Sequence, residues 1–185
     1  MTNTRERHEC LSAIRTGSVA AFEALYEAES DAIYRFLVRL SQDHFAARDM
    51  AQDVWLKLAR HAPRLPEGTH LRGWLYTVAR RKFISHKRAQ LLDISRLLML
   101  GITREAWVDP ASDSAFEVHV ALGQLSDRDR DVLLLTGASG LGAREAAKVL
   151  GLSEAAFRQR LCRARRRFAE KLDPSRARGA RIREA

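Results

Sequence analysis

Apolar residues recur along most of the chain at spacings of three and four, which places them on one face of a helix. Runs that alternate apolar and polar residues, as half-buried strands do, are lacking. Ser18 can cap a first helix that buries Phe22, Leu25 and Tyr26. A second helix is predicted around the apolar positions Ile33, Leu37 and Leu40.

A third helix is predicted over residues 46–60, because Met50, Val54 and Leu58 lie four residues apart and share one face. Two prolines and a glycine between residues 61 and 69 end the helical pattern. A fourth helix then runs from about residue 71 into the high 80s, and its predicted buried positions are Leu71, Leu75 and Val78.

The chain beyond this helix is harder to assign. Residues 91–102 are compatible with a short amphipathic helix, whereas Trp107-Val-Asp-Pro-Ala-Ser-Asp-Ser is turn-rich and acidic, as linkers are. We therefore expect an all-α fold of two small helical domains joined by a flexible linker. Its parts are an N-terminal domain at 1–90, the linker at 91–117, a C-terminal domain at 118–173, and a basic, disordered tail at 174–185.

The C-terminal domain contains the pattern of a helix-turn-helix. A short helix over residues 143–150 offers the small Ala147 where a second helix can cross it, and Gly151 can adopt the left-handed conformation that ends a helix. Ser153 can cap the second helix. The apolar stripe predicted on that helix consists of Phe157, Leu161, Ala164, Phe168 and Leu172.

The net charge of +9 is concentrated in two places. Residues 72–88 carry +6 without an acid and residues 154–185 carry +7, so the rest of the chain carries −4. Two separate basic patches favour two contacts with a polyanion, and two solvated helix faces are the alternative interpretation.

Polar residues of the second helix of the helix-turn-helix lie off its apolar stripe. Arginine can bond guanine and glutamine can bond adenine, so Arg158, Gln159 and Arg160 are predicted near bases. Glu154 has two possible roles. It either accepts a hydrogen bond from a cytosine amine or serves as a first-turn acid that the helix dipole stabilises. The full predicted DNA-contacting set is Ser153, Glu154, Arg158, Gln159, Arg160, Arg163, Arg166 and Arg167.

Other functional classes find little support. Cys10 and Cys162 are far apart, and neither they nor the histidines have metal-ligand spacing, so no metal or other cofactor is expected. Without a Gly-rich phosphate loop or a nucleophile–base pair, the chain is not expected to be an enzyme. With neither a signal peptide nor an apolar run near the ~20 residues of a membrane span, we expect a cytoplasmic protein without membrane insertion.

Two sets of motifs carry a family resemblance. The first domain reads Ala47-Arg-Asp-Met-Ala-Gln-Asp-Val-Trp55 and then Trp74-Leu-Tyr-Thr-Val-Ala-Arg-Arg81. The second contains Leu125-Ser-x-x-x-Arg130-x-Val-Leu-Leu-Leu, Glu145-Ala-Ala-x-x-Leu-Gly-Leu-Ser and Arg160-Leu-x-Arg-Ala-Arg165. In this order the motifs resemble the extracytoplasmic-function (ECF) class of bacterial RNA polymerase sigma factors, from Phe22 to Leu172.

The resemblance implies a protein that binds core RNA polymerase and directs promoter-specific initiation of transcription. It implies that Asp49, Gln52 and Asp53 hold the clamp helices of the largest polymerase subunit, and that the helix-turn-helix reads the −35 element. It also implies an anti-sigma factor as a partner. The residues it assigns to the −10 element are Arg80, Arg81, Lys82, Ser85, His86 and Arg88.

Some positions depart from the family pattern. Arg81 stands where Asn is common and Ser85 where Asp is common, which implies an altered −10 preference. Trp74 and Phe83 are either core residues or platforms on which single-stranded bases stack. The alternative function is an autonomous helix-turn-helix regulator whose N-terminal domain mediates dimerisation or effector binding, and the acid-free stretch at 72–88 favours the sigma factor.

Overall fold

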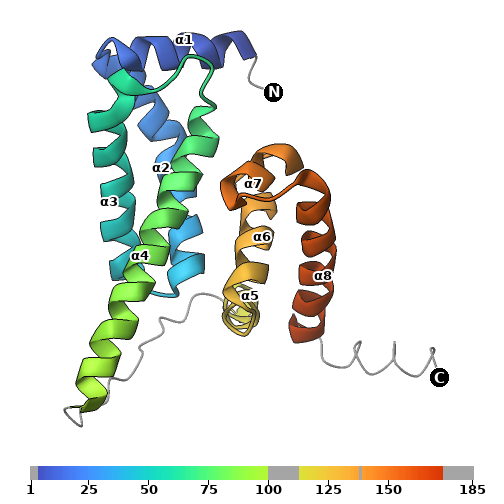
Figure 1. Ribbon diagram of the computed structural model, residues 1–185. Helices are drawn as coiled ribbons and strands as arrows, with labels where there is room; N and C mark the ends of the chain where they lie inside the picture. Colours follow the sequence, from blue (N-terminus) through green and yellow to red (C-terminus); the bar gives the residue numbers. More distant parts are fainter. Residues whose placement is uncertain (1–3, 100–112, 138, 173–185) are drawn as a thin grey trace. The chain divides into compact units, whose positions relative to one another are not determined.

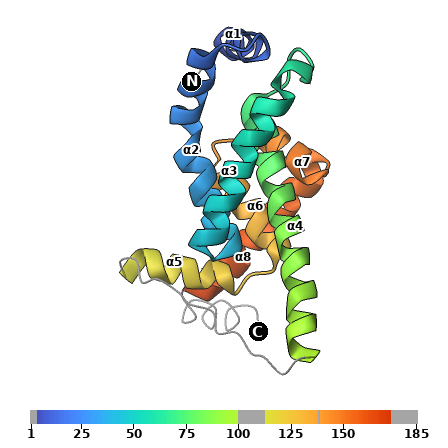
Figure 2. The ribbon, with the colours of Figure 1, turned by 90° about the vertical axis from the view of Figure 1, so that its left-hand side faces the viewer.

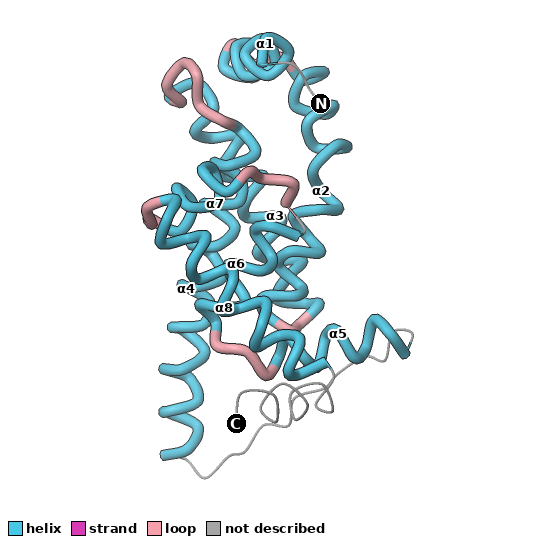
Figure 3. The backbone as a smooth tube through the Cα atoms, turned by 90° about the vertical axis from the view of Figure 1, so that its right-hand side faces the viewer, coloured by secondary structure: helices cyan, strands magenta, loops and turns pink. Residues whose placement is uncertain are grey.

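The computed structural model describes residues 4–99, 113–137 and 139–172 (Figure 1). Across these residues every regular element is a helix and no strand forms (Figure 3). The chain divides into two compact units, Met1–Ala106 and Trp107–Ala185. The predicted all-α fold of two small helical domains is therefore confirmed. The helices are α1 (Thr4–Arg15), α2 (Val19–Ser41), α3 (His44–His61) and α4 (Leu71–Met99) in the first unit, and α5 (Asp113–Gly123), α6 (Asp127–Gly137), α7 (Ala143–Leu150) and α8 (Glu154–Leu172) in the second.

Local capping explains where the helices of the first unit begin and end. The Ser18 side chain accepts a hydrogen bond from the Ala21 N–H at 3.3 Å and starts α2. Gln42 ends α2 in the left-handed conformation (φ 59°), and Asp43 immediately caps α3. After α3, the chain passes through the 3₁₀ turn Ala62–Arg64 before α4 begins. The predicted break between the third and fourth helices is confirmed.

The core of the first unit lies between α2, α3 and α4, which pack side by side (Figure 2). Phe36 of α2 meets Tyr76 of α4 edge-to-face, with ring centroids 4.9 Å apart. The predicted core positions of these helices are all buried: Ile33, Leu37, Leu40, Met50, Val54, Leu58, Leu71, Leu75 and Val78.

The sequence interpretation was wrong about the start of this unit. Residues 19–41 form one helix instead of two, because no proline or glycine interrupts them. Phe22 and Leu25 are only half-buried, and Tyr26 is 47% exposed. The helix α1, which was not predicted, buries Leu11 and packs against α2 and the 3₁₀ turn.

The region between the two units is described only in part. The helix α4 continues to Met99, beyond residue 90 where the expected linker begins, and α5 already begins at Asp113. The rest of the expected linker, residues 100–112, and the expected disordered tail at 174–185 lie outside the described residues. No helix of the described part of the chain is long and apolar enough to cross a bilayer.

The second unit is organised around a buried arginine. The Arg130 guanidinium donates to the carbonyl oxygens of Leu122 at 2.8 Å, Gly123 at 2.9 Å and Leu125 at 3.3 Å. These carbonyls lie at the end of α5 and in the turn that follows, beyond the regular hydrogen bonding of the helix, although the Leu122 carbonyl also accepts from the Leu125 N–H at 3.2 Å. Burial lowers the pKa of Arg130, and the neighbouring Asp127 and Asp131 oppose that effect. The arginine thus fixes the turn that leads into α6.

The predicted helix-turn-helix is formed by α7 and α8. Gly151 ends α7 with φ 66°, and the Ser153 side chain accepts a hydrogen bond from the Ala156 N–H at 3.2 Å at the start of α8. Ala147 is buried at the crossing. Along the predicted apolar stripe, Phe157 and Ala164 are buried and Leu161 and Phe168 are half-buried. Leu172 is 39% exposed, so its predicted burial is wrong: the helix ends beyond the core it packs on.

Candidate nucleic-acid interface

The outer surface of α8 is dominated by arginine. Arg158, Gln159 and Arg163 are exposed, and Arg160 is half-buried at the edge of the core. Because α8 is the second helix of the helix-turn-helix, its exposed N-terminal half is the part that enters a major groove in proteins of this geometry. The predicted base-reading residues therefore lie together on one helix, with their side chains accessible.

Several α8 side chains are engaged within the unit. Glu154 and Arg158 form an ion pair at 2.5 Å one turn apart, and Arg166 approaches Glu170 at 3.6 Å. Arg167 reaches the buried Asp129 of α6 at 2.6 Å. In the described residues, Arg160 and Arg163 form no ion pair. These two arginines keep their full charge available to a polyanion.

Two of the predicted contact residues also serve the local fold. The Ser153 side chain caps α8, and Glu154 lies in the first turn, where the helix dipole favours an acid. The structural interpretation of Glu154 therefore has support from its position and from its pairing with Arg158. A contact from Glu154 to cytosine would require that pair to open.

The sequence interpretation missed further basic residues of this surface. Arg165 is exposed on α8, and Arg144 and Lys148 are exposed on α7. The first helix of a helix-turn-helix crosses the nucleic-acid backbone, so basic residues there suit phosphate. The spacing of four between Arg144 and Lys148 was a usable signal, because it places both side chains on one face of a helix.

The second basic surface lies along α4. Arg81, Ser85 and Arg88 are exposed, and Arg80, Lys82 and His86 are half-buried. The aromatic residues nearby are less available. Tyr76 is fully buried and Phe83 is 6% exposed, so Phe83 belongs to the core, whereas Trp74 is half-buried.

Internal carboxylates hold two of the basic side chains of α4. The Arg72 guanidinium donates to Glu29, a buried residue of α2, at 2.6 Å. Lys82 contacts Asp53 of α3 at 2.6 Å, on the exposed side of the unit. The structure thus brings together a residue assigned to the −10 element and one assigned to polymerase docking.

The residues assigned to polymerase docking, Asp49, Gln52 and Asp53, are all exposed on α3. The opposite face of the helix carries the buried Met50, Val54 and Leu58. An exposed carboxylate–amide–carboxylate row on a helix is suited to bind basic and polar groups of another protein. The predicted exposure of these three side chains is observed, and their role in polymerase docking stays a prediction.

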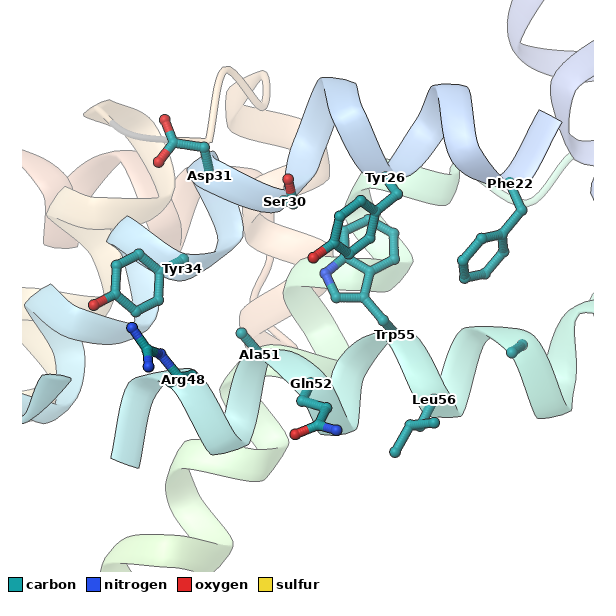
Figure 4. A pocket seen from close by; sticks show the side chains of 11 residues that line it. Phe22, Tyr26, Ser30, Asp31, Tyr34, Arg48, Ala51, Gln52, Trp55 and Leu56 are labelled. Carbon is teal, nitrogen blue, oxygen red and sulfur yellow. The ribbon is translucent and has the colours of Figure 1, made fainter. Parts of the chain in front are cut away.

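An aromatic pocket between α2 and α3 adjoins this row (Figure 4). Its volume is about 770 Å³, and Gln52 and Leu56 stand at its edge. Trp55 lies edge-to-face with Tyr26, at a centroid distance of 4.9 Å. The sequence interpretation missed the pocket because it assigned Tyr26 to the core.

Each unit of the chain matches a known protein family. The Sigma-70 region 2 family matches residues 25–91, and the Sigma-70 region 4 family matches residues 115–168. The chain is 28% identical to the ECF RNA polymerase sigma factor SigM of Bacillus subtilis over 79% of its own length and 91% of that protein. It is 29% identical to the ECF sigma factor SigC of Mycobacterium tuberculosis, over 89% and 92% of the two chains.

A solved structure is similar as well. The sigma factor RpoE of Bartonella quintana, crystallised with the anti-sigma factor NepR, superimposes with a TM-score of 0.74 at 28% identity, over 83% of this chain and 98% of that one. The region 2 match contains the basic surface of α4, and the region 4 match contains that of α8. The chain therefore belongs to the sigma-70 family of RNA polymerase sigma factors, in its extracytoplasmic-function class.

Proposed function

We propose a distribution of roles over the surfaces of this sigma factor, a protein that binds core RNA polymerase and directs promoter-specific transcription. The observation that carries the proposal is the exposed row of Asp49, Gln52 and Asp53 in a unit whose α4 also carries a basic surface. An autonomous regulator has no evident need for both in its N-terminal domain.

Polymerase docking is assigned to the α3 row. Its two carboxylates and one amide are exposed, and the opposite face of the helix is buried in the core. We assign as its partner the clamp helices of the largest polymerase subunit. The aromatic pocket beside Gln52 offers apolar area next to these charges, a combination typical of protein interfaces.

Recognition of the −10 element is assigned to α4. Arg80, Arg81, Lys82, Ser85, His86 and Arg88 line it, and positive charge along a helix suits a melted strand. Since Phe83 is buried, Trp74 is the aromatic residue of this helix that remains for stacking. The arginine at position 81 and the serine at 85 imply a −10 preference of this chain's own.

Recognition of the −35 element is assigned to α8. Arg158, Gln159 and Arg160 are assigned to bases, and Arg163 and Arg166 to phosphates. Ser153 and Glu154 contribute at the start of the helix, where the N–H groups also favour phosphate. Arg167, which Asp129 holds, receives a separate role below.

The protein has no chemistry of its own in this proposal and needs no cofactor. It acts in the cytoplasm, where it meets both polymerase and promoter. Its similarity to a sigma factor crystallised with an anti-sigma factor supports the same class of partner here.

Run-off transcription tests the proposal. Purified core polymerase is incubated with a genomic promoter library, with and without the chain. Promoter-specific transcripts that need the chain are expected. Repression or silence, together with binding of the chain alone to discrete DNA sites, would instead identify an autonomous helix-turn-helix regulator.

A further inference from the structure

Asp129 is a buried acid of the second unit. It lies in the first turn of α6, and its side chain is 7% exposed. The Ser126 hydroxyl accepts a hydrogen bond from the Asp129 N–H at 3.2 Å and donates one to the carboxylate at 2.9 Å. A carboxylate at a helix N-terminus is also favoured by the helix dipole. These interactions hold the charge in one place beneath α8.

Arg167 completes the site from α8. Its guanidinium donates to the Oδ2 atom of Asp129, which also accepts the hydrogen bond from Ser126, at 2.6 Å. The two residues are 38 positions apart, so the contact ties α8 to α6. A charge-assisted bond to a buried acid is geometrically demanding, and loss of Arg167 would leave the buried charge of Asp129 uncompensated, whereas Arg167 is 56% exposed and stays hydrated without its partner.

Arg163, one turn earlier on α8, provides the contrast. It is exposed and forms no ion pair in the described residues, whereas Arg167 is committed to Asp129. Each of the two arginines contributes +1 to the formal net charge of the chain. Only Arg163 is unengaged and available to phosphate.

We propose that Arg167 is a positioning residue and not a DNA contact. Through Asp129 it fixes the orientation of α8 on α6, and thereby the angle at which Arg158, Gln159 and Arg160 meet the bases. This inference rests on the proposed function of α8 in reading the −35 element. It makes Asp129, which is too buried to touch DNA, a determinant of promoter selectivity.

The test uses the full chain assembled with core polymerase. The probes are a promoter obtained in the run-off experiment and its single-base variants in the upstream element. The variants of the chain are R167Q, D129N, their combination, the conservative R167K, and R163A as the matched control. Three quantities are measured: discrimination between the promoter and its variants, the slope of log affinity against log salt, and the thermal midpoint of the free chain.

R167Q and D129N are each expected to lower discrimination roughly tenfold, the amount that one base contact supplies. Their salt slope stays at the wild-type value, and the double variant is no worse than either single one, because all three break the same contact. R167K restores part of the discrimination. R163A lowers the slope by about 0.9, as loss of one phosphate contact does, and keeps the thermal midpoint.

Two results would overturn the proposal. If R167Q lowers the salt slope by about one while D129N has no effect, Arg167 is a phosphate contact. If both variants lower the thermal midpoint but leave discrimination unchanged, the pair serves stability alone. A wild-type holoenzyme that selects no promoter would refute the proposed function itself, whereas failure of the positioning role alone leaves wild-type transcription intact.

Discussion

Tyr76 lies at the centre of the first unit, with its ring fully buried against Phe36. Burial raises the pKa of its hydroxyl to about 12, and the nearby carboxylate of Glu29 adds to the rise, while Arg72 and Arg35 oppose it. The neutral hydroxyl is thus favoured in the folded chain. In the unfolded chain the same group has its ordinary pKa of 10.

This difference predicts a loss of stability in alkali. Below pH 10 both states hold the tyrosine proton, so its contribution is complete; between pH 10 and 12 the unfolded state loses the proton first. The free energy of unfolding should therefore fall by about 1.4 kcal/mol per pH unit in that window from this group. Urea titrations of wild type and Tyr76→Phe at successive pH values measure the difference.

The control for that measurement is Tyr26→Phe, because Tyr26 is 47% exposed. It removes a tyrosine hydroxyl outside the core, whereas the Tyr76→Phe curve should be flatter than that of wild type above pH 10. Parallel curves for wild type and Tyr76→Phe would contradict the assignment of this alkaline loss to Tyr76.

At the scale of elements, caps and breakers made much of the fold predictable. The helices α7 and α8 lie close to their predicted limits, because Gly151 ends the first and Ser153 caps the second. The helix α3 lies within two residues of the predicted range 46–60, since Asp43 caps its start and the proline-containing turn follows its end. The segment that became α2 has no such punctuation. The apolar positions change face between Tyr26 and Ile33, so the sequence pattern resembles that of two helices. The structure has one continuous helix over these residues.

The pairing of charges was not predictable. Lys82 pairs with Asp53, 29 residues away in the sequence, and Arg167 pairs with Asp129, 38 residues away. Periodicity identifies the face of a helix but not the residue that a neighbouring helix places opposite it. The candidate surfaces could therefore be located from sequence, while the division between engaged and available arginines required the structure.

The turn of the helix-turn-helix gives a prediction at this scale. Gly151 has φ +66°, and an alanine there would meet no other atom within 4 Å, so the cost of Gly151→Ala is backbone strain alone. We expect a loss of about 1 kcal/mol in the free energy of unfolding. Gly137→Ala at the end of α6 is the matched control, since it also has open space but no positive φ. Equal stabilities of the two variants in denaturant titrations would count against a strained turn.

For the whole molecule, the positive charge available to bind a polyanion is smaller than the formal charge of the basic residues, because some of them pair with carboxylates. Arg72, Lys82, Arg158 and Arg167 each face a carboxylate of the same unit. The two basic surfaces remain, but each has fewer unengaged cations than its sequence contains. Short-range pairing thus concentrates the available charge on residues such as Arg81 and Arg163.

Docking to polymerase can be separated from folding. The combined replacement Asp49→Ala, Gln52→Ala and Asp53→Ala should abolish co-purification with core polymerase and leave the thermal midpoint nearly unchanged. The side chains are exposed, and a surface ion pair such as Asp53–Lys82 contributes at most about 1 kcal/mol. Glu23→Ala with Glu27→Ala, exposed on α2, is the control and should co-purify normally. Normal co-purification of the triple variant would refute the docking assignment.

The two cysteines are one half-buried thiol, Cys10 on α1, and one exposed thiol, Cys162 on α8. Burial raises the pKa of Cys10, which lowers its thiolate fraction, so an alkylating reagent should modify Cys162 first. Cys162 lies between Leu161 and Arg163 on the helix proposed to enter the groove. Promoter DNA seated on α8 should therefore slow alkylation of Cys162 and leave that of Cys10 unaffected. The natural chain thus carries its own footprinting reporter, with an internal standard in the other unit.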